Sequence, residues 1–466
     1  MTKTETAFLY ILRAVLHEEK PVDPGLTGEE WAALLRLAET HKLLPLILDA
    51  ACGLPSYRNT AAPVRTVAAR PESLPIEGKA SAQPTDELAE RQPAASAQQN
   101  KPETPYQAAR RKDGARSSAP PAWKEMALEQ AARQAIQENE FLNLILALQK
   151  QGLDPVVMKG PVCRNLYPRP LLRPSVDDDL LVADEQTAAY HAALLDFGMT
   201  ADEPDADLDK AWELSYHKPN SPLYIELHKR LFDPNSAAFE DFNAPFEGAL
   251  ERAIPVTIQD VTLKTLAPAD HLLFLILHAF KHFLHSGFGM RIIADICLFT
   301  WRYGEQIDFA ALRAVCDARR CERFTAAVYR IGEKYLDLPI PEPFAVIEVD
   351  ETELLADVLV SGLHGAEIDR LHSANITLGA VADENQGKTR SGGLAKTLFP
   401  SAKKLSGRYP YLETKPWLLP VAWASRVGTY FKERGKYGEE SPAASLRIGK
   451  ERVKLLRTYG VIERGK

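Results

Sequence analysis

The spacing of hydrophobic residues is helical at both ends of the chain and alternating in the middle. In residues 29–51 the apolar positions Trp31, Leu34, Leu35 and Ala38 recur every three and four residues, which predicts helices. Residues 123–152 predict a longer helix that ends at Gly152, because glycine is common at helix C-termini. From Ala267 onward the spacing is helical again, so helices are expected on both sides of a central region.

The central region has the pattern of short strands. Residues 155–158 (PVVM) and 176–183 (VDDDLLVA) predict two strands, and residues 184–198 predict a helix that ends at Gly198. Residues 211–232 predict a hairpin that turns at Pro219, Asn220 and Ser221. Strands joined by both helices and hairpins predict an α+β fold, with a small mixed β-sheet core flanked by helices and with helical N- and C-terminal regions.

Residues 55–122 are rich in Pro, Ala, Ser and Gln. Their apolar residues follow neither the helical nor the alternating spacing, so we expect this segment to be disordered. We interpret this segment as an insertion between helices of one domain, because the first helices are too short to form a core alone; a domain linker is the alternative. The predicted organisation has five parts: N-terminal helices in 1–54, the insertion in 55–122, a core with its leading helix in 123–260, a helical domain in 261–345 and a basic helical region in 346–466.

Composition changes this picture in two respects. The chain of 466 residues is 45% hydrophobic and 26% charged, and no apolar run is long enough to span a bilayer, so we expect a cytoplasmic protein with no membrane span. The net charge is −7, yet residues 387–466 carry 18 Lys and Arg against six Glu and no Asp, a net charge of +12. This region could bind phosphates, RNA or anionic lipid; we favour packing on the acidic remainder with its aromatic residues buried, namely Trp417, Trp423, Tyr430 and Phe431.

Three consecutive aspartates lie inside the second predicted strand. Because side chains alternate along a strand, Asp177 and Asp179 share one face and Asp178 points to the opposite, apolar face. Two carboxylates about 6 to 7 Å apart on a strand repel each other unless a cation lies between them. Oxygen ligands of this kind favour Mg²⁺ or Mn²⁺, so the pair predicts a divalent metal site.

The predicted hairpin adds a third carboxylate. Its second strand has a polar face of Tyr224, Glu226 and His228, so Glu226 could join the aspartates from a neighbouring strand. Three such carboxylates can bind metal ions and activate a hydroxyl for attack on a phosphate. Lys159 and Gly160 lie at a turn that opens a helix, and with Arg173 they are candidates for phosphate binding.

Residues 156–182 and 224–231 resemble uncharacterised bacterial nucleotidyltransferases of the polymerase-β-like superfamily. The shared pattern is a strand ending in Lys-Gly, a Tyr-Pro, and then Arg-Pro-Ser-x-Asp-x-Asp-Leu-Leu-Val. The resemblance implies transfer of a nucleoside monophosphate from an NTP to a hydroxyl of a small molecule, a protein or an RNA end, with release of pyrophosphate. It implies catalytic and metal-binding roles for Asp177, Asp179 and Glu226, with Mg²⁺ or Mn²⁺ as cofactor. It further implies nucleotide-binding roles for Lys159, Gly160, Arg173 and Ser175.

One position departs from the family pattern. The residue between the two aspartates is usually apolar, whereas here it is Asp178, which needs a partner or must stay protonated on the apolar side of the sheet. A register shift that makes Asp178 a competing ligand is one interpretation. The alternative function is therefore a catalytically weakened nucleotide-binding or scaffold protein. A nucleic-acid acceptor is not favoured, because the chain is acidic overall.

Four histidines fall on one face of the helix predicted after Ala267, namely His271, His278, His282 and His285. Histidines one turn apart can share a metal ion. The interpretation that we favour is a helix that packs against the catalytic sheet with its histidines near the edge of the cleft.

Overall fold

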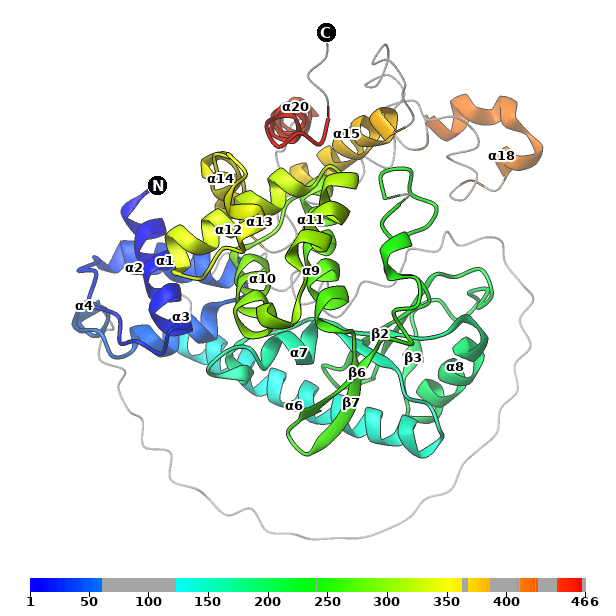
Figure 1. Cartoon of the computed structure of the whole chain (residues 1–466), viewed down its shortest axis with the longest axis horizontal. Coiled ribbons are helices and arrows are strands. Elements are labelled where there is room, and N and C mark those ends of the chain that lie inside the picture. The colour runs from blue at the N-terminus through cyan, green and yellow to red at the C-terminus, as the bar shows by residue number, and fades with distance from the viewer. Residues whose placement is uncertain are drawn as a thin grey trace, which may run out of the picture.

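The computed structural model in Figure 1 describes residues 1–60, 123–239, 241–362, 368–385, 409, 411–423, 425 and 442–462. Residues 61–122, which hold most of the predicted disordered insertion, lie outside the described residues.

A seven-stranded mixed sheet carries the central region, and the predicted α+β fold is confirmed. Its strands are β1 (Val156–Met158), β2 (Asp178–Leu181), β3 (Thr200–Ala201), β4 (Glu213–His217), β5 (Tyr224–His228), β6 (Ile254–Ile258) and β7 (Val261–Thr265). The strand order is β3-β4-β5-β2-β1-β7-β6. Strand β2 pairs parallel to β5 and antiparallel to β1, and β4 and β5 form the predicted hairpin.

The hairpin of β6 and β7 was not predicted from the sequence. Its residues do alternate, with Ile254, Val256 and Ile258 on one face of β6. Pro255 lowers the strand signal because proline cannot donate a backbone hydrogen bond, and it is tolerated here because β6 is the edge strand. The turn between the strands has no glycine or asparagine, and Gln259 takes up the positive φ of +51°.

Helices surround the sheet, as expected. Before and within the sheet region they are α1 (Lys3–Leu16), α2 (Gly28–Thr40), α3 (Leu44–Ala51), α4 (Pro55–Thr60), α6 (Trp123–Lys150), α7 (Gly160–Arg164) and α8 (Thr187–Asp196). After the sheet they are α9 (Pro268–His285), α10 (Met290–Tyr303), α11 (Phe309–Ala318), α12 (Glu322–Leu336), α13 (Glu342–Ala345), α14 (Thr352–Ser361), α15 (Ile368–Asn385), α18 (Tyr411–Thr414) and α20 (Pro442–Thr458). Short 3-10 turns include η1 (Pro170–Leu172) and η2 (Asp184–Gln186).

Local sequence fixes several helix ends. Thr2 and Thr27 begin α1 and α2 with capping boxes, in which the threonine side chain and the glutamate three residues later satisfy each other's backbone N–H groups. Gly152 and Gly198 follow α6 and α8 with positive φ values of +75° and +87°, as the sequence predicted.

One large hydrophobic cluster joins the sheet to the helices and extends from Ala7 to Ile462. Helix α1 packs against α2, α3 and α12, and α3 packs against α6 (Figure 1). A second, small cluster consists of Leu412 and Ala422 with their neighbours. The first helices therefore share the core of the sheet region.

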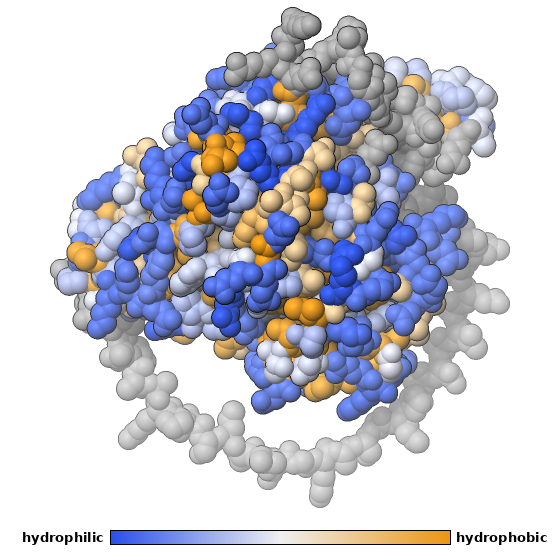
Figure 2. All heavy atoms as spheres, viewed as in Figure 1, coloured by the Kyte–Doolittle hydropathy of each residue, from blue (hydrophilic) through white to orange (hydrophobic). Residues whose placement is uncertain are grey.

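The surface drawn in Figure 2 is mostly hydrophilic, with hydrophobic side chains gathered in small separate groups. Within the described part of the chain, no helix is long and apolar enough to cross a membrane.

Candidate functional site

Pairing of β2 with β5 brings the predicted carboxylates together. The Cα atoms of Asp179 and Glu226 are register partners in this parallel pair. Asp177 directly precedes β2, and its side chain lines the same pocket as those of Asp179 and Glu226. Strand β5 buries Ile225 and Leu227 on its other face, as the alternation predicted.

Asp179 contacts two basic side chains, those of His228 and Lys159. Its Oδ1 accepts hydrogen bonds from His228 Nε2 at 3.0 Å and lies 2.9 Å from Lys159 Nζ. Its Oδ2 is buried and has no hydrogen-bond partner among the described residues. His228 Nε2 also lies 3.6 Å from a Glu226 oxygen, and His228 Nδ1 lies 3.6 Å from Glu213. One ligand atom each from Asp179, Glu226 and His228 lies within 4.8 Å of the others, which is a candidate metal-binding group.

The carboxylates repel each other in a poorly solvated place. Burial, reinforced by the charge of Asp177, raises the pKa of Glu226 to about 7. Burial also acts to raise the pKa of Asp179, but the charge of Lys159 and the hydrogen bond from His228 lower it below its usual range. Burial acts to lower the pKa of His228, yet its contacts with Asp179 and Glu226 raise that pKa to about 9. Positive charge is therefore stabilised at this point of the sheet.

Lys159 connects the carboxylates to helix α9. Its backbone has a φ of +45°, a strained conformation for a residue with a side chain, of the kind that clusters at functional sites. Its N–H donates to His271 Nε2 at 3.2 Å, which anchors this turn to α9. Its Nζ lies between Asp179 and His278, the latter with its Nε2 at 3.3 Å. The acidic neighbours outweigh burial and raise the pKa of Lys159.

Gly160 has no room for a side chain. A Cβ atom built there would lie 2.5 Å from Asp178 Oδ1 and 3.3 Å from the carbonyl oxygen of Asp177. The backbone of Gly160 therefore packs closely against the start of strand β2. Gly160 also lines the pocket, and α7, which it opens, has only five residues. Its nucleotide-binding role stays a prediction.

Asp178 points away from the pocket, as the alternation predicted. Its Oδ2 accepts a hydrogen bond from Gln137 Nε2 of α6 at 2.9 Å, and its Oδ1 lies 3.7 Å from Arg164 Nη2 of α7. Burial raises the pKa of Asp178 to about 6, against the opposing effects of Arg164 and Gln137. Arg164 is itself fully buried and also binds Glu138 at 2.7 Å and Ser175 Oγ at 2.6 Å. The extra carboxylate is therefore held by a buried polar network on the far face of the sheet.

The other two predicted nucleotide-binding residues line the pocket but have protein partners. Arg173 forms a bidentate ion pair with Asp295 of α10, with Nε to Oδ1 at 2.9 Å and Nη2 to Oδ2 at 2.5 Å. Ser175 accepts from Arg164, and its N–H donates to Gln134 of α6 at 2.6 Å. Their contact with a nucleotide stays a prediction.

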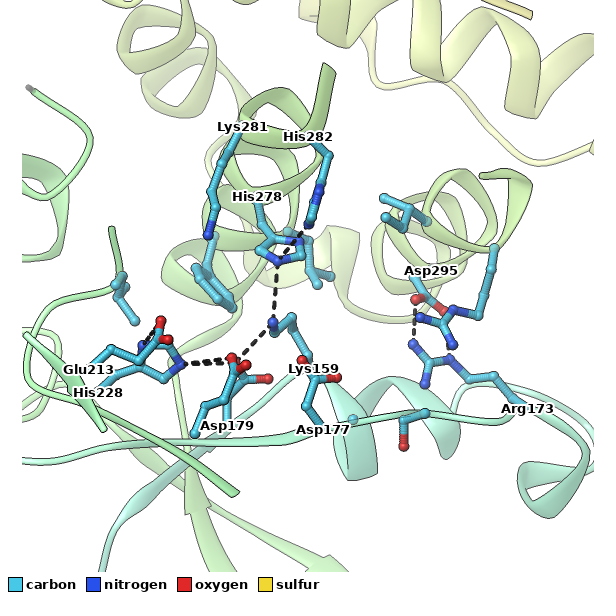
Figure 3. Close-up of a pocket in the computed structure, with 18 residues that line it drawn as sticks. Lys159, Arg173, Asp177, Asp179, Glu213, His228, His278, Lys281, His282 and Asp295 are labelled. Atoms are coloured by element: carbon cyan, nitrogen blue, oxygen red, sulfur yellow. Dashed lines mark hydrogen bonds and ion pairs between the residues drawn. The ribbon is translucent and has the colours of Figure 1, made fainter. Parts of the chain in front are cut away.

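The pocket between the carboxylates and α9 has a volume of about 220 Å³ (Figure 3). Its lining includes charged and histidine side chains to which the sequence assigned no specific role, namely Glu213, His228, His278, Lys281, His282, Arg291 and Asp295. His228 lay on the predicted polar face of its strand. The favoured interpretation of the α9 histidines holds for His278 and His282, which line the pocket. It does not hold for His271, which is buried against the turn at Lys159, or for His285, which is not part of the pocket lining.

Comparison with known proteins gives one match. No curated protein and no solved structure matches the chain. Residues 106–337 match the model of a family described as an uncharacterised nucleotidyltransferase. The matched range contains the whole sheet, with Asp177, Asp179 and Glu226, and continues to the end of α12. Over these residues, the chain belongs to an uncharacterised nucleotidyltransferase family.

Proposed function

We propose that this protein transfers a nucleoside monophosphate from an NTP to a hydroxyl acceptor and releases pyrophosphate. The observation that carries the proposal is the meeting of Asp177, Asp179 and Glu226 at the paired strands β2 and β5. Membership of a nucleotidyltransferase family supports the same reaction class and the NTP as substrate.

The donor set of the pocket suits a divalent metal ion. The buried Oδ2 of Asp179 has no hydrogen-bond partner among the described residues, which leaves it able to accept a cation. Carboxylate oxygens of Asp177, Asp179 and Glu226 suit Mg²⁺ or Mn²⁺. An ion held there supplies charge stabilisation to the phosphate and acidifies the acceptor hydroxyl.

Other side chains of the pocket accept the proton and stabilise the charge of the phosphate. Glu226, whose pKa is raised to about 7, accepts the proton of the acceptor hydroxyl. The acceptor oxygen forms a bond to the α-phosphorus while the bond from that phosphorus to pyrophosphate breaks. Lys159 lies beside the carboxylates and offsets the negative charge that gathers on the phosphate.

The alternative of a weakened, non-catalytic nucleotide-binding protein was motivated by Asp178. Because Asp178 lies on the opposite face with Gln137 and Arg164, it does not crowd the carboxylate pair.

The test is transfer of label from each of the four α-³²P-labelled NTPs into cell extract, with Mg²⁺ or Mn²⁺. We expect wild type to label an acceptor. In Asp177→Asn and in Asp179→Asn the rate of label transfer should fall at least about a hundredfold, since each substitution removes a charge that acts in the transition state. Asp196→Asn changes an exposed aspartate at the end of α8 and should behave as wild type. Labelling that survives Asp179→Asn, or that needs no metal, would contradict the proposal.

A further inference from the structure

Helix α9 presents three nitrogen-bearing side chains to the pocket from the side opposite the carboxylates. His278, Lys281 and His282 occupy positions i, i+3 and i+4, which lie on one face of a helix. All three line the pocket, and in Figure 3 they extend from α9 toward Lys159. Lys281 has no hydrogen bond or ion pair with any described residue. The pocket therefore has an acidic floor and a basic roof.

Lys159 links the floor and the roof. Its Nζ is 2.9 Å from Asp179 Oδ1 and 3.3 Å from His278 Nε2, and His278 Nε2 is in turn 3.3 Å from His282 Nε2. A row of nitrogen atoms thus leads from the carboxylates to α9. An elongated anion that starts at the carboxylates would meet these nitrogens in succession.

Lys281 is poorly compensated in the structure as it stands. Burial, together with the nearby charge of Lys159, lowers the pKa of Lys281. The charge of Glu213 opposes this lowering, but Glu213 lies on β4 at the sheet side of the pocket, 3.6 Å from His228. An ammonium group that loses water without gaining a partner is unfavourable, and a bound anion removes that penalty.

We propose that the α9 face formed by His278, Lys281 and His282 binds the β- and γ-phosphates of the substrate NTP. This inference rests on the proposed function, in which the α-phosphate lies at Asp177, Asp179 and Glu226. The pyrophosphate part then extends past Lys159 to α9, where the ammonium group of Lys281 donates strong, charge-assisted hydrogen bonds to phosphate oxygens and the imidazole N–H groups add further donors. The same donors stabilise the pyrophosphate as its bond to the α-phosphorus breaks.

The test is calorimetric titration of the full chain with inorganic tripolyphosphate in the presence of Mg²⁺. We expect Lys281→Gln to weaken binding about tenfold or more and Lys281→Arg to keep it within about threefold, because arginine retains the charge. Lys150→Gln, which changes an exposed lysine at the end of α6, should bind as wild type. If Lys281→Gln fails to fold by circular dichroism, His282→Gln takes its place, with the same expected loss.

Two results would overturn the inference. Unchanged tripolyphosphate affinity in Lys281→Gln and His282→Gln would exclude α9 as the phosphate site. An equal loss for inorganic phosphate would indicate a site for a single phosphate, such as one carried by the acceptor. Failure of the proposed function looks different: wild type would then transfer no label from any NTP, while tripolyphosphate binding still depended on Lys281.

Discussion

At the scale of single residues, three adjacent aspartates have two different environments. Asp177 and Asp179 line the pocket, whereas Asp178 is buried against Gln137 and Arg164. The sequence predicted this division because alternation along a strand is a local property. It could not predict the partners of Asp178, since Gln137 and Arg164 reach it only through the packing of α6 and α7 on the sheet.

Substitution of Asp178 tests that division. Asp178→Asn keeps an oxygen that can accept the hydrogen bond from Gln137, and Arg164 keeps Glu138, so we expect the free energy of unfolding to change by less than about 2 kcal/mol. Thermal stabilisation by NTP with Mg²⁺ should persist in Asp178→Asn and disappear in Asp179→Asn. Scanning calorimetry of both variants measures this. Equal loss of ligand stabilisation in the two variants would mean that Asp178 binds the metal.

At the scale of elements, local patterns were informative and long-range pairing was not. Helices α6, α8 and α9 and the β4–β5 hairpin follow from periodicity and turn residues within each segment. The parallel pairing of β2 with β5, which places Glu226 beside Asp179, joins strands far apart in sequence. Periodicity gives the faces of a strand and not its neighbours, so the sequence predicted that Glu226 was available without predicting its register.

His41, which ends α2, connects the first helices to α10, and we expect it to make the stability of the protein depend on pH. Its Nδ1 accepts a hydrogen bond from the backbone N–H of Met290 at 3.1 Å, and its ring stacks on Phe8. Burial lowers the pKa of His41 to about 4, from 6.5. The unfolded chain therefore binds a proton at a higher pH than the folded chain. This contribution to stability is complete above about pH 6.5 and is lost as the pH falls toward 4.

The variant His41→Asn keeps an acceptor for Met290 but does not titrate. Between pH 7.5 and pH 5 we expect wild type to lose about 2 kcal/mol more of its free energy of unfolding than His41→Asn does. Urea unfolding at the two pH values gives both losses. Parallel losses in the two proteins would show that His41 takes up its proton equally in the folded and unfolded chains.

At the scale of the whole molecule, the basic C-terminal region is partly integrated into the main core. Helix α20 lies beside α15 in Figure 1, and Leu456, Tyr459 and Ile462 are buried in the large cluster. The prediction that the aromatic residues of this region are buried is wrong for Trp417, which is 70% exposed, and holds in part for Trp423, which is half-buried against the small cluster. Tyr430 and Phe431 lie outside the described residues. Net charge predicted an attraction to the acidic remainder, but it does not determine which side chains are buried.

A buried ion pair holds α20 to the rest of the molecule. Arg452 is 3% exposed, and its Nη1 lies 2.7 and 2.8 Å from the two carboxylate oxygens of Asp357 in α14. Its Nη2 donates to the carbonyl oxygen of Phe283 near the end of α9, the helix that also carries Lys281. Most other charges of α20 cannot act in this way, because an exposed pair contributes little to stability.

We expect Arg452→Met to lower the free energy of unfolding by about 3 to 5 kcal/mol, because Asp357 would be left buried without its partner. Arg447→Met, at an exposed position of the same helix, should change it by less than about 0.5 kcal/mol. The double variant Arg452→Met/Asp357→Leu should recover most of the loss, since it leaves no unpaired charge. Urea unfolding of wild type, the two single variants and the double variant measures the free energy of unfolding of each. If Arg452→Met unfolds at the same urea concentration as Arg447→Met, the apolar contacts of α20 hold it in place without the ion pair.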